Sequence, residues 1–310
     1  MKRILLFVVF SAVLLSLWGC NGKPEARPFI TKWQGKAGQE LKIPILGTYT
    51  LTWYNEATPE DRRTEQVTIT AYMGENGFEE TTPYILIPPT DGIYVVEAGP
   101  EGVEGMLMSF ENSFEYGHTL LTVVQFGDVV WKRLNRAFFT CSNMRFEEGI
   151  DTPNLSQCTS LSGMFWGCKA FNSPLAQWDV SKITNMEDMF HDCETFNQPL
   201  DSWDVGRVTL MGGMFVGCSH FNQPLARWDV SQVTNMSAMF SGCTLFNQSL
   251  EAWKINPLAR TDGMQAMFYG SPAAELPFVA KWREEGCQLD YIEEEFVPEA
   301  ADFEEEMEEQ

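Results

Sequence analysis

The apolar residues between Leu161 and Phe268 recur with a fixed period of 25 residues. Each unit carries a phenylalanine, a cysteine three residues later and a tryptophan ten residues after that. The series are Phe165, Phe190, Phe215, Phe240; Cys168, Cys193, Cys218, Cys243; and Trp178, Trp203, Trp228, Trp253. Such repetition is typical of stacked units, none of which can bury its apolar face alone.

The first half of each unit has the spacing of a helix face. In the second unit the apolar residues lie three or four positions apart: Ile183, Met186, Met189, Phe190 and Cys193. This spacing predicts a short helix. Thr184 and Asn185 stand where N-caps would lie. Glycines follow at the predicted helix ends: Gly167, Gly217 and Gly242.

The second half of each unit reads Leu-x-x-Trp-x-Val and predicts a short strand. Trp203 and Val205 would point to one face of that strand. A helix and a strand within 25 residues predict an α/β solenoid of leucine-rich-repeat type. An asparagine precedes each strand, and we expect these residues to form a ladder joining adjacent units: Asn172, Asn197, Asn222 and Asn247.

The repeat FNQPL-x-x-WDVS-x-VTNM-x-x-MF-x-GC resembles that of BspA-type leucine-rich-repeat surface proteins, which are found on many bacteria as lipoproteins. The resemblance covers about Leu134 to Phe268. The last unit departs from it at Ser249 and Lys254 and has three residues inserted before Met267. The resemblance implies a non-enzymatic adhesion or protein-binding module that acts at the cell surface.

The N-terminus predicts export and lipidation. Lys2 and Arg3 precede an apolar run that is too short for a stable membrane span, and Gly19 precedes Cys20. This arrangement resembles a bacterial lipobox, in which Cys20 becomes the acylated first residue of the mature protein. Residues 1–19 would then be a signal peptide and the location the cell envelope, lipid-anchored at the outer membrane or cell surface. An ordinary cleaved secretory signal is the alternative.

The segment after the tether (residues 20–28) predicts a small β-sandwich domain over residues 29–113. Tyr49, Leu51 and Trp53 alternate with polar residues, as in a half-buried strand. The predicted strands are Glu40–Leu46, Tyr49–Asn55, Gln66–Met73, Pro83–Ile87 and Gly92–Ala98. FITKW and GIYVVEAG resemble parts of a polycystic-kidney-disease-like module of the immunoglobulin type.

The repeat solenoid with its caps is predicted over residues 118–287. We expect the segment His118–Met144 to supply the N-terminal cap and residues 269–287 to cover the open end of the core. Residues 288–310 should form an acidic disordered tail, because like charges in a run repel one another. The formal net charge of −22 disfavours nucleic acid as a partner.

Catalytic and metal-binding motifs are absent from the sequence. His118, His191 and His220 form no set, and there is no HExxH motif, phosphate-binding glycine loop or Ser-His-Asp arrangement. Stacked cysteines could bind zinc or form disulfides, but a row of parallel side chains suits neither geometry. We therefore expect free buried thiols, no metal, no cofactor and no enzymatic activity.

The outward positions of the predicted strands are the candidate partner-binding surface: Gln177, Asp179, Ser202, Asp204, Arg227 and Asp229. Each Asp could accept amide hydrogen bonds from the turn that follows it, which we favour, or a cation or basic partner could lie over the row. The varied neighbours would carry specificity for an unknown surface or extracellular protein. The alternative function is a glycan-binding accessory lipoprotein, with Trp53 and Tyr54 stacking on sugar rings.

Overall fold

The computed structural model describes residues 26–74, 79–109 and 113–290. Cys20, the signal peptide and nearly all of the acidic tail lie outside the described residues. Strands are the main regular structure: β1 (Phe29–Gly35), β2 (Leu41–Ile43), β3 (Ile45–Asn55), β4 (Arg63–Ile69), β5 (Ala71–Met73), β6 (Glu79–Thr81), β7 (Tyr84–Leu86), β8 (Gly92–Ala98), β9 (Val103–Met106), β10 (Leu120–Gln125) and β11 (Arg145–Phe146). The helices are α1 (Ser113–Tyr116), α2 (Pro277–Glu284) and the 3-10 turns η1 (Gly117–Thr119), η2 (Pro257–Ala259) and η3 (Pro272–Glu275).

The N-terminal strands form one large mixed sheet in the order β11-β10-β1-β8-β3-β4, with β9 also paired to β3. The pairs β2–β7 and β5–β6 are separate small sheets. The predicted alternation in β3 is confirmed, because Tyr49, Leu51 and Trp53 are buried. The predicted small β-sandwich is not what forms, since one mixed sheet takes seven strands and the other two sheets have two strands each.

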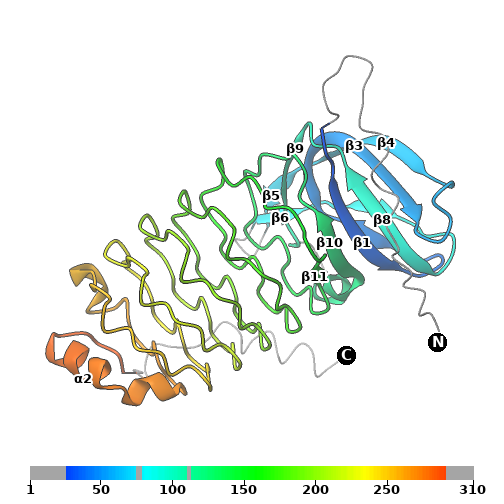
Figure 1. The fold of residues 1–310 in the computed structure, drawn as a ribbon. Helices are drawn as coiled ribbons and strands as arrows, with labels where there is room; N and C mark the ends of the chain where they lie inside the picture. Colours follow the sequence, from blue (N-terminus) through cyan, green and yellow to red (C-terminus); the bar gives the residue numbers. More distant parts are fainter. Residues whose placement is uncertain (1–25, 75–78, 110–112, 291–310) are drawn as a thin grey trace, which may run out of the picture.

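Strand β10 comes from the segment that we expected to cap the repeats. It pairs antiparallel with β1 and parallel with β11. One hydrophobic core cluster extends from Phe29 in this sheet to Leu289 beyond the last repeat. The sheet and the repeats are therefore packed together, as Figure 1 shows.

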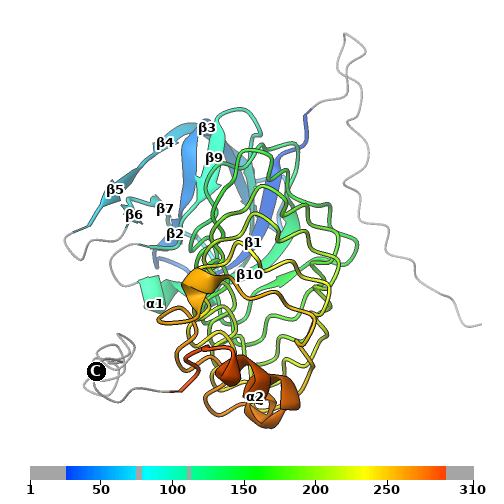
Figure 2. The same ribbon diagram turned by 90° about the vertical axis from the view of Figure 1, so that its left-hand side faces the viewer.

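The prediction of an α/β solenoid is wrong. Between β11 and η2 the described chain contains neither a helix nor a named strand. Residues 130–270 instead form stacked irregular coils, which we call the repeat stack (Figures 1 and 2). The isolated β-bridges between adjacent coils are short and parallel, as at Asn185↔Leu210 and Leu210↔Asn235.

The backbone conformation explains why the predicted helix does not form. Asp188 and Asp192 have φ of 54° and 55°, which no right-handed helix accommodates. The alternate amides of Met186, Asp188, Phe190 and Asp192 donate to carbonyls of the next coil at 2.8 to 2.9 Å. The residues between them close three-residue turns, as in the bond from the Met189 amide to the Met186 carbonyl at 3.3 Å. Consecutive turns of this kind place apolar residues at three-residue intervals, which are also the intervals of a helix face.

The predicted strand at Trp203 and Val205 is also absent, although both side chains are buried and Asp204 between them is exposed. The indole N–H of Trp203 donates to the Leu175 carbonyl of the preceding coil at 2.9 Å. At this position a side-chain hydrogen bond joins adjacent coils, whereas strands would be joined by backbone hydrogen bonds.

Side-chain columns hold adjacent coils together. Phe190 stacks on Phe165 and Phe215 with ring centroids 5.5 and 5.6 Å apart. The asparagine ladder is confirmed, because the Asn172 and Asn197 side-chain oxygens accept the backbone amides of Asn197 and Asn222 at 3.0 Å. Regular spacing of identical residues thus supplies both the apolar and the polar contacts of the stack.

Strand β9 begins the stack. The amides of Met106 and Met108 donate to the carbonyls of Arg133 and Arg136 at 3.2 and 3.1 Å, as each coil donates to the next. Gly105 lies so close to the first coil that a Cβ there would be 2.4 Å from the Arg133 carbonyl oxygen. The sheet edge therefore serves as the template for the first coil.

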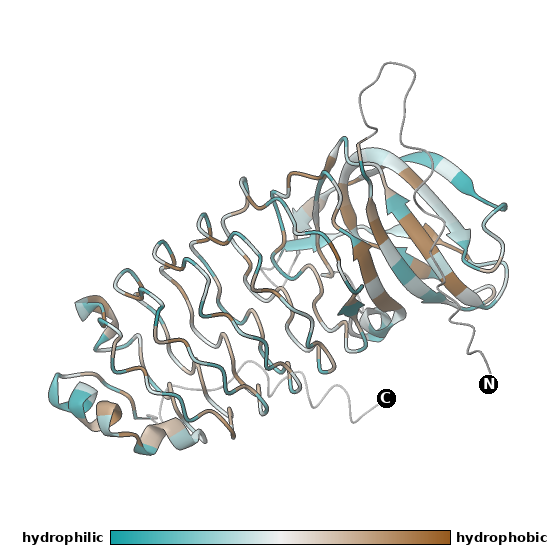
Figure 3. Ribbon diagram, viewed as in Figure 1, coloured by the Kyte–Doolittle hydropathy of each residue, from teal (hydrophilic) through white to brown (hydrophobic). Residues whose placement is uncertain are grey.

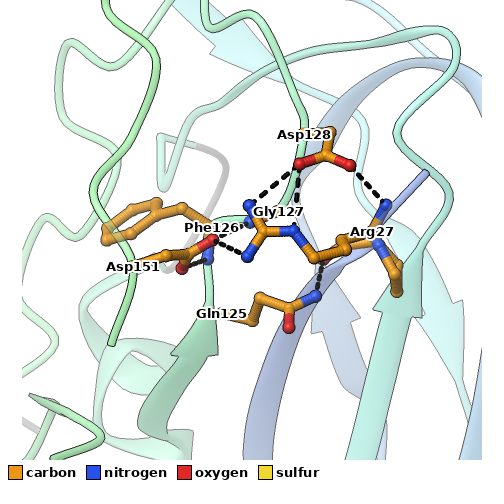
Figure 4. A network of polar contacts seen from close by, with 7 residues as sticks. Arg27, Gln125, Phe126, Gly127, Asp128 and Asp151 are labelled. Atoms are coloured by element: carbon orange, nitrogen blue, oxygen red, sulfur yellow. Dashed lines mark hydrogen bonds and ion pairs between the residues drawn. The ribbon is translucent and has the colours of Figure 1, made fainter. Parts of the chain in front are cut away.

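The start of the described chain is fixed to this junction (Figure 4). The Arg27 guanidinium donates to Asp128 at 2.9 Å and lies 3.2 Å from Asp151. Asp151 accepts the amides of Phe126 and Gly127 at 2.7 and 2.9 Å. The hydrogen bonds from the Arg27 amide and side chain hold the pKa of Asp128 below its usual value.

Candidate functional site

The six candidate partner-binding residues lie on one exposed row of the repeat stack, which we call the aspartate face: Gln177, Asp179, Ser202, Asp204, Arg227 and Asp229. All six are exposed. Figure 3 shows the coils of the stack alternating between hydrophilic and hydrophobic residues along the chain. The structure therefore brings the predicted residues together, although the strands that were expected to carry them are absent.

Each aspartate of this face closes a turn. The carboxylates of Asp179, Asp204 and Asp229 accept the amide two residues further on, at 3.1, 3.2 and 3.1 Å. The favoured interpretation of the Asp row is thus confirmed. Hydrogen bonds from Ser181 and Ser231 lower the pKa of Asp179 and Asp229 below its usual value. The charges are compatible with the stack because local donors engage them.

The residues beside the aspartates are less constrained. The Ser202 hydroxyl donates to the Ala176 carbonyl at 3.2 Å. Arg227 is anchored by its backbone amide, which donates to Asp201 at 3.0 Å, while its side chain is 79% exposed. Ser202 thus joins two coils, whereas the Arg227 guanidinium is largely exposed, with its Nε 3.8 Å from Asp201 Oδ2.

The stacked cysteines are free and buried. The thiols of Cys193 and Cys218 donate to the carbonyls of Phe165 and Phe190 at 2.9 Å. Burial raises the pKa of both thiols well above its usual value. Among the described residues no group of three or more His, Cys, Asp or Glu side chains could hold a metal ion.

A surface contact that sequence reasoning missed joins Trp166 and His191. Their rings stack with centroids 4.3 Å apart, and the His191 Nδ1 lies 3.0 Å from Asp188 Oδ1. The two residues occupy the same position in successive units, so the 25-residue period could have indicated their contact. His220 has a different partner, since its Nδ1 lies 2.8 Å from the Glu194 carbonyl oxygen.

The aromatic residues proposed for glycan stacking are covered. Trp53 is 5% exposed, with the Arg63 guanidinium 4.8 Å from its ring centroid. The Arg62 guanidinium lies 4.2 Å from the Tyr54 ring, whose hydroxyl donates to Glu97 at 3.0 Å. Trp53 is therefore not open to a sugar, and Arg62 lies over the half-buried Tyr54 ring.

No helix among the residues that the structure describes is long and apolar enough to cross a membrane. The search of curated proteins and that of solved structures found no match. Two overlapping segments, residues 132–253 and 200–282, match the family described as "Mycoplasma protein of unknown function, DUF285". The chain is thus similar to that family over its repeat stack.

Proposed function

We propose that this protein is a bacterial envelope lipoprotein whose repeat stack is a non-enzymatic binding or adhesion module for a surface or extracellular protein. The aspartate face is the observation that carries the proposal. Within it, constant residues maintain the stack and varied residues face outward. This division is typical of repeat proteins that keep one scaffold and change the ligand.

Exposure and charge support this assignment of the face. The Arg227 side chain is 79% exposed, with its Nε 3.8 Å from Asp201 Oδ2, and it lies beside aspartates whose carboxylates accept backbone amides. A partner that approaches it would meet polar side chains whose hydrogen-bonding groups are accessible to solvent. Protein interfaces favour arginine as a central contact residue.

Lipidation at Cys20 would place the module close to a membrane. Arg27 is fixed to the junction between the sheet and the stack, and it lies seven residues after Cys20. A fully extended chain spans about 3.3 to 3.6 Å per residue, so the junction would lie within about 25 Å of the anchor. The proposal therefore has the stack act at the membrane surface.

The anchor is tested by partition of the full chain between detergent and aqueous phases, with mass analysis of its N-terminus. We expect the wild-type protein in the detergent phase with an acylated Cys20, and Cys20→Ser in the aqueous phase. A wild-type protein that carries no lipid mass would contradict the anchor and leave the binding module to be judged separately.

The binding face is tested on arrays of extracellular proteins and of glycans with the full chain. The variant carries Gln177→Ala, Ser202→Ala and Arg227→Ala. Its matched control carries Lys169→Ala, His220→Ala and Leu245→Ala, which also removes three exposed side chains and one permanent positive charge. We expect the first variant to lose at least tenfold in affinity for a protein ligand and the control to keep it. Equal losses, or binding to glycans alone, would refute the assignment.

A further inference from the structure

From Leu161 onward, each coil of the repeat stack donates four alternate backbone amides to the coil that follows it, up to the last coil. In the last complete pair, the amides of Met236, Ala238, Phe240 and Gly242 donate to carbonyls of residues 263–269 at 2.6 to 2.8 Å. The same arrangement joins the two preceding pairs of coils. Adjacent coils are therefore joined by backbone N–H groups that donate to the coil on the C-terminal side.

The last coil has the equivalent four amides and no following coil. We call the N–H groups of Met264, Ala266, Phe268 and Gly270 the amide row. None of them has a hydrogen-bond acceptor among the residues that the structure describes. Met264, Ala266 and Phe268 are at most 5% exposed, whereas Gly270 is exposed. A buried amide without a partner costs free energy, so this row favours any ligand that supplies acceptors.

The edge formed by the amide row offers donors only. The carbonyls of Gln265, Met267 and Tyr269 accept the amides of the preceding coil. The carbonyls of Met264, Ala266 and Phe268 accept turn bonds from Met267, Tyr269 and Ser271. A β-strand edge would present donors and acceptors together. Ala266 and Gly270 have φ of 53° and 68°, and alternating backbone of this kind binds groups that carry negative charge.

Three residues of the amide row, Ala266, Phe268 and Gly270, line an open cavity of about 190 Å³ between the last coil and α2. The rest of its lining includes Ala274, Val279, Leu289 and the ion pair of Arg283 with Asp290, whose atoms are 2.9 Å apart. Helix α2 covers the aromatic columns, since Phe278 packs edge-on against Phe268 and Trp282 stacks on Trp253. Figure 2 shows α2 at this end of the stack. Helix α2 thus covers the side-chain core at this end of the stack, whereas the N–H groups of the amide row have no backbone partner among the described residues.

We propose that the amide row binds a peptide segment of a partner protein, whose carbonyls at alternate residues accept the four amides. We expect the bound segment to adopt the backbone of a coil, because each coil from Asn185 onward accepts the four amides of its predecessor in that conformation. It therefore favours glycine, asparagine or aspartate at two positions four residues apart, where φ is positive, and disfavours β-branched residues there. This site lies at the end of the stack and is distinct from the aspartate face.

The probe is a synthetic peptide with the sequence of residues 209–217, TLMGGMFVG. In the stack its carbonyls at Leu210, Gly212, Met214 and Val216 accept the amides of the preceding coil. The control peptide carries Gly213→Val and Gly217→Val, at the positions with φ of 63° and 69°. Valine strongly disfavours positive φ, so the control keeps the length of the probe and loses the conformation.

Hydrogen exchange of the full chain, followed by mass spectrometry, measures the result. Without peptide we expect residues 264–270 to exchange faster than the paired residues 236–242. The probe should slow exchange in residues 264–270 at least tenfold, and the valine peptide should leave it unchanged. Ala274→Phe, which fills the cavity, should abolish the effect, whereas Ala280→Phe on the exposed side of α2 should keep it.

Three results would overturn the proposal. The first is an absence of slowing at millimolar probe, and the second is equal slowing by both peptides. The third is slow exchange in the full chain that becomes fast in a chain ending at Asp290, because the protein's own C-terminal residues would then occupy the row. The two peptides are compared on the wild-type protein, so the test stands even where Ala274→Phe lowers the melting temperature.

Discussion

Trp203 offers the sharpest test of how the coils are held together. Its ring is 4% exposed and lies 6.4 Å from the Phe190 ring, and its indole N–H donates to the Leu175 carbonyl of the preceding coil. Trp203→Ala removes a buried aromatic from an inner coil and should cost about 3 to 5 kcal/mol of unfolding free energy. The loss includes about 1 kcal/mol for the hydrogen bond.

Two further variants separate the contributions. Trp203→Phe keeps most of the apolar contact and loses the hydrogen bond, so it should cost about 1 to 2 kcal/mol. Asp204→Ala removes an exposed side chain with one turn bond to the Gly206 amide, and it should cost under about 1 kcal/mol. The variants therefore form a series in which burial outweighs polar contact.

Urea unfolding followed by tryptophan fluorescence and circular dichroism gives the three free energies. The two signals should coincide, because the sheet and the stack share one core. Equal losses for Trp203→Ala and Asp204→Ala would refute the assignment of buried and exposed faces. A Trp203→Phe variant as stable as the wild type would refute the contribution of the hydrogen bond between coils.

Three other predictions concern the backbone and the thiols. Ala238→Gly should raise the unfolding free energy by about 0.5 to 1 kcal/mol, because alanine is strained at φ 53°. Gly242→Ala should lower the unfolding free energy by about 1 to 2 kcal/mol, because it places alanine at φ 70°. Thermal melts that show the opposite signs would contradict the coil geometry. Gly105→Ala should lower the melting temperature by several degrees, since its Cβ would meet the Arg133 carbonyl, whereas Gly38→Ala, with open space around it, should lower it less. In the folded protein, thiol reagents at neutral pH should not label the stacked cysteines Cys168, Cys193, Cys218 and Cys243, because burial raises the pKa of each thiol. All four should react once the protein is unfolded without reductant. Two or fewer reactive thiols after unfolding would show that these cysteines are bonded.

The sequence by itself determined the contents of each repeat. Identical residues 25 positions apart must meet when the units stack, which is why the asparagine ladder and the free buried cysteines could be predicted. The burial of Trp203 and Val205 and the exposure of Asp204 followed from their alternation. The turn bonds of the aspartates followed from the short side chain and the amide two residues later.

Tertiary structure alone decided the backbone of each repeat. A helix and a chain of three-residue turns place apolar residues at the same intervals, so the period could not distinguish them. Gly163 and Gly213 inside the predicted helices were a local sign of positive φ, but Asp188 and Ala238 occupy the same position in sister coils. The amides of these residues bond to the next coil, and those acceptors exist only once the coils are stacked. The amide row at the end of the stack arises for the same reason, because its amides lack the neighbouring coil that every earlier coil has.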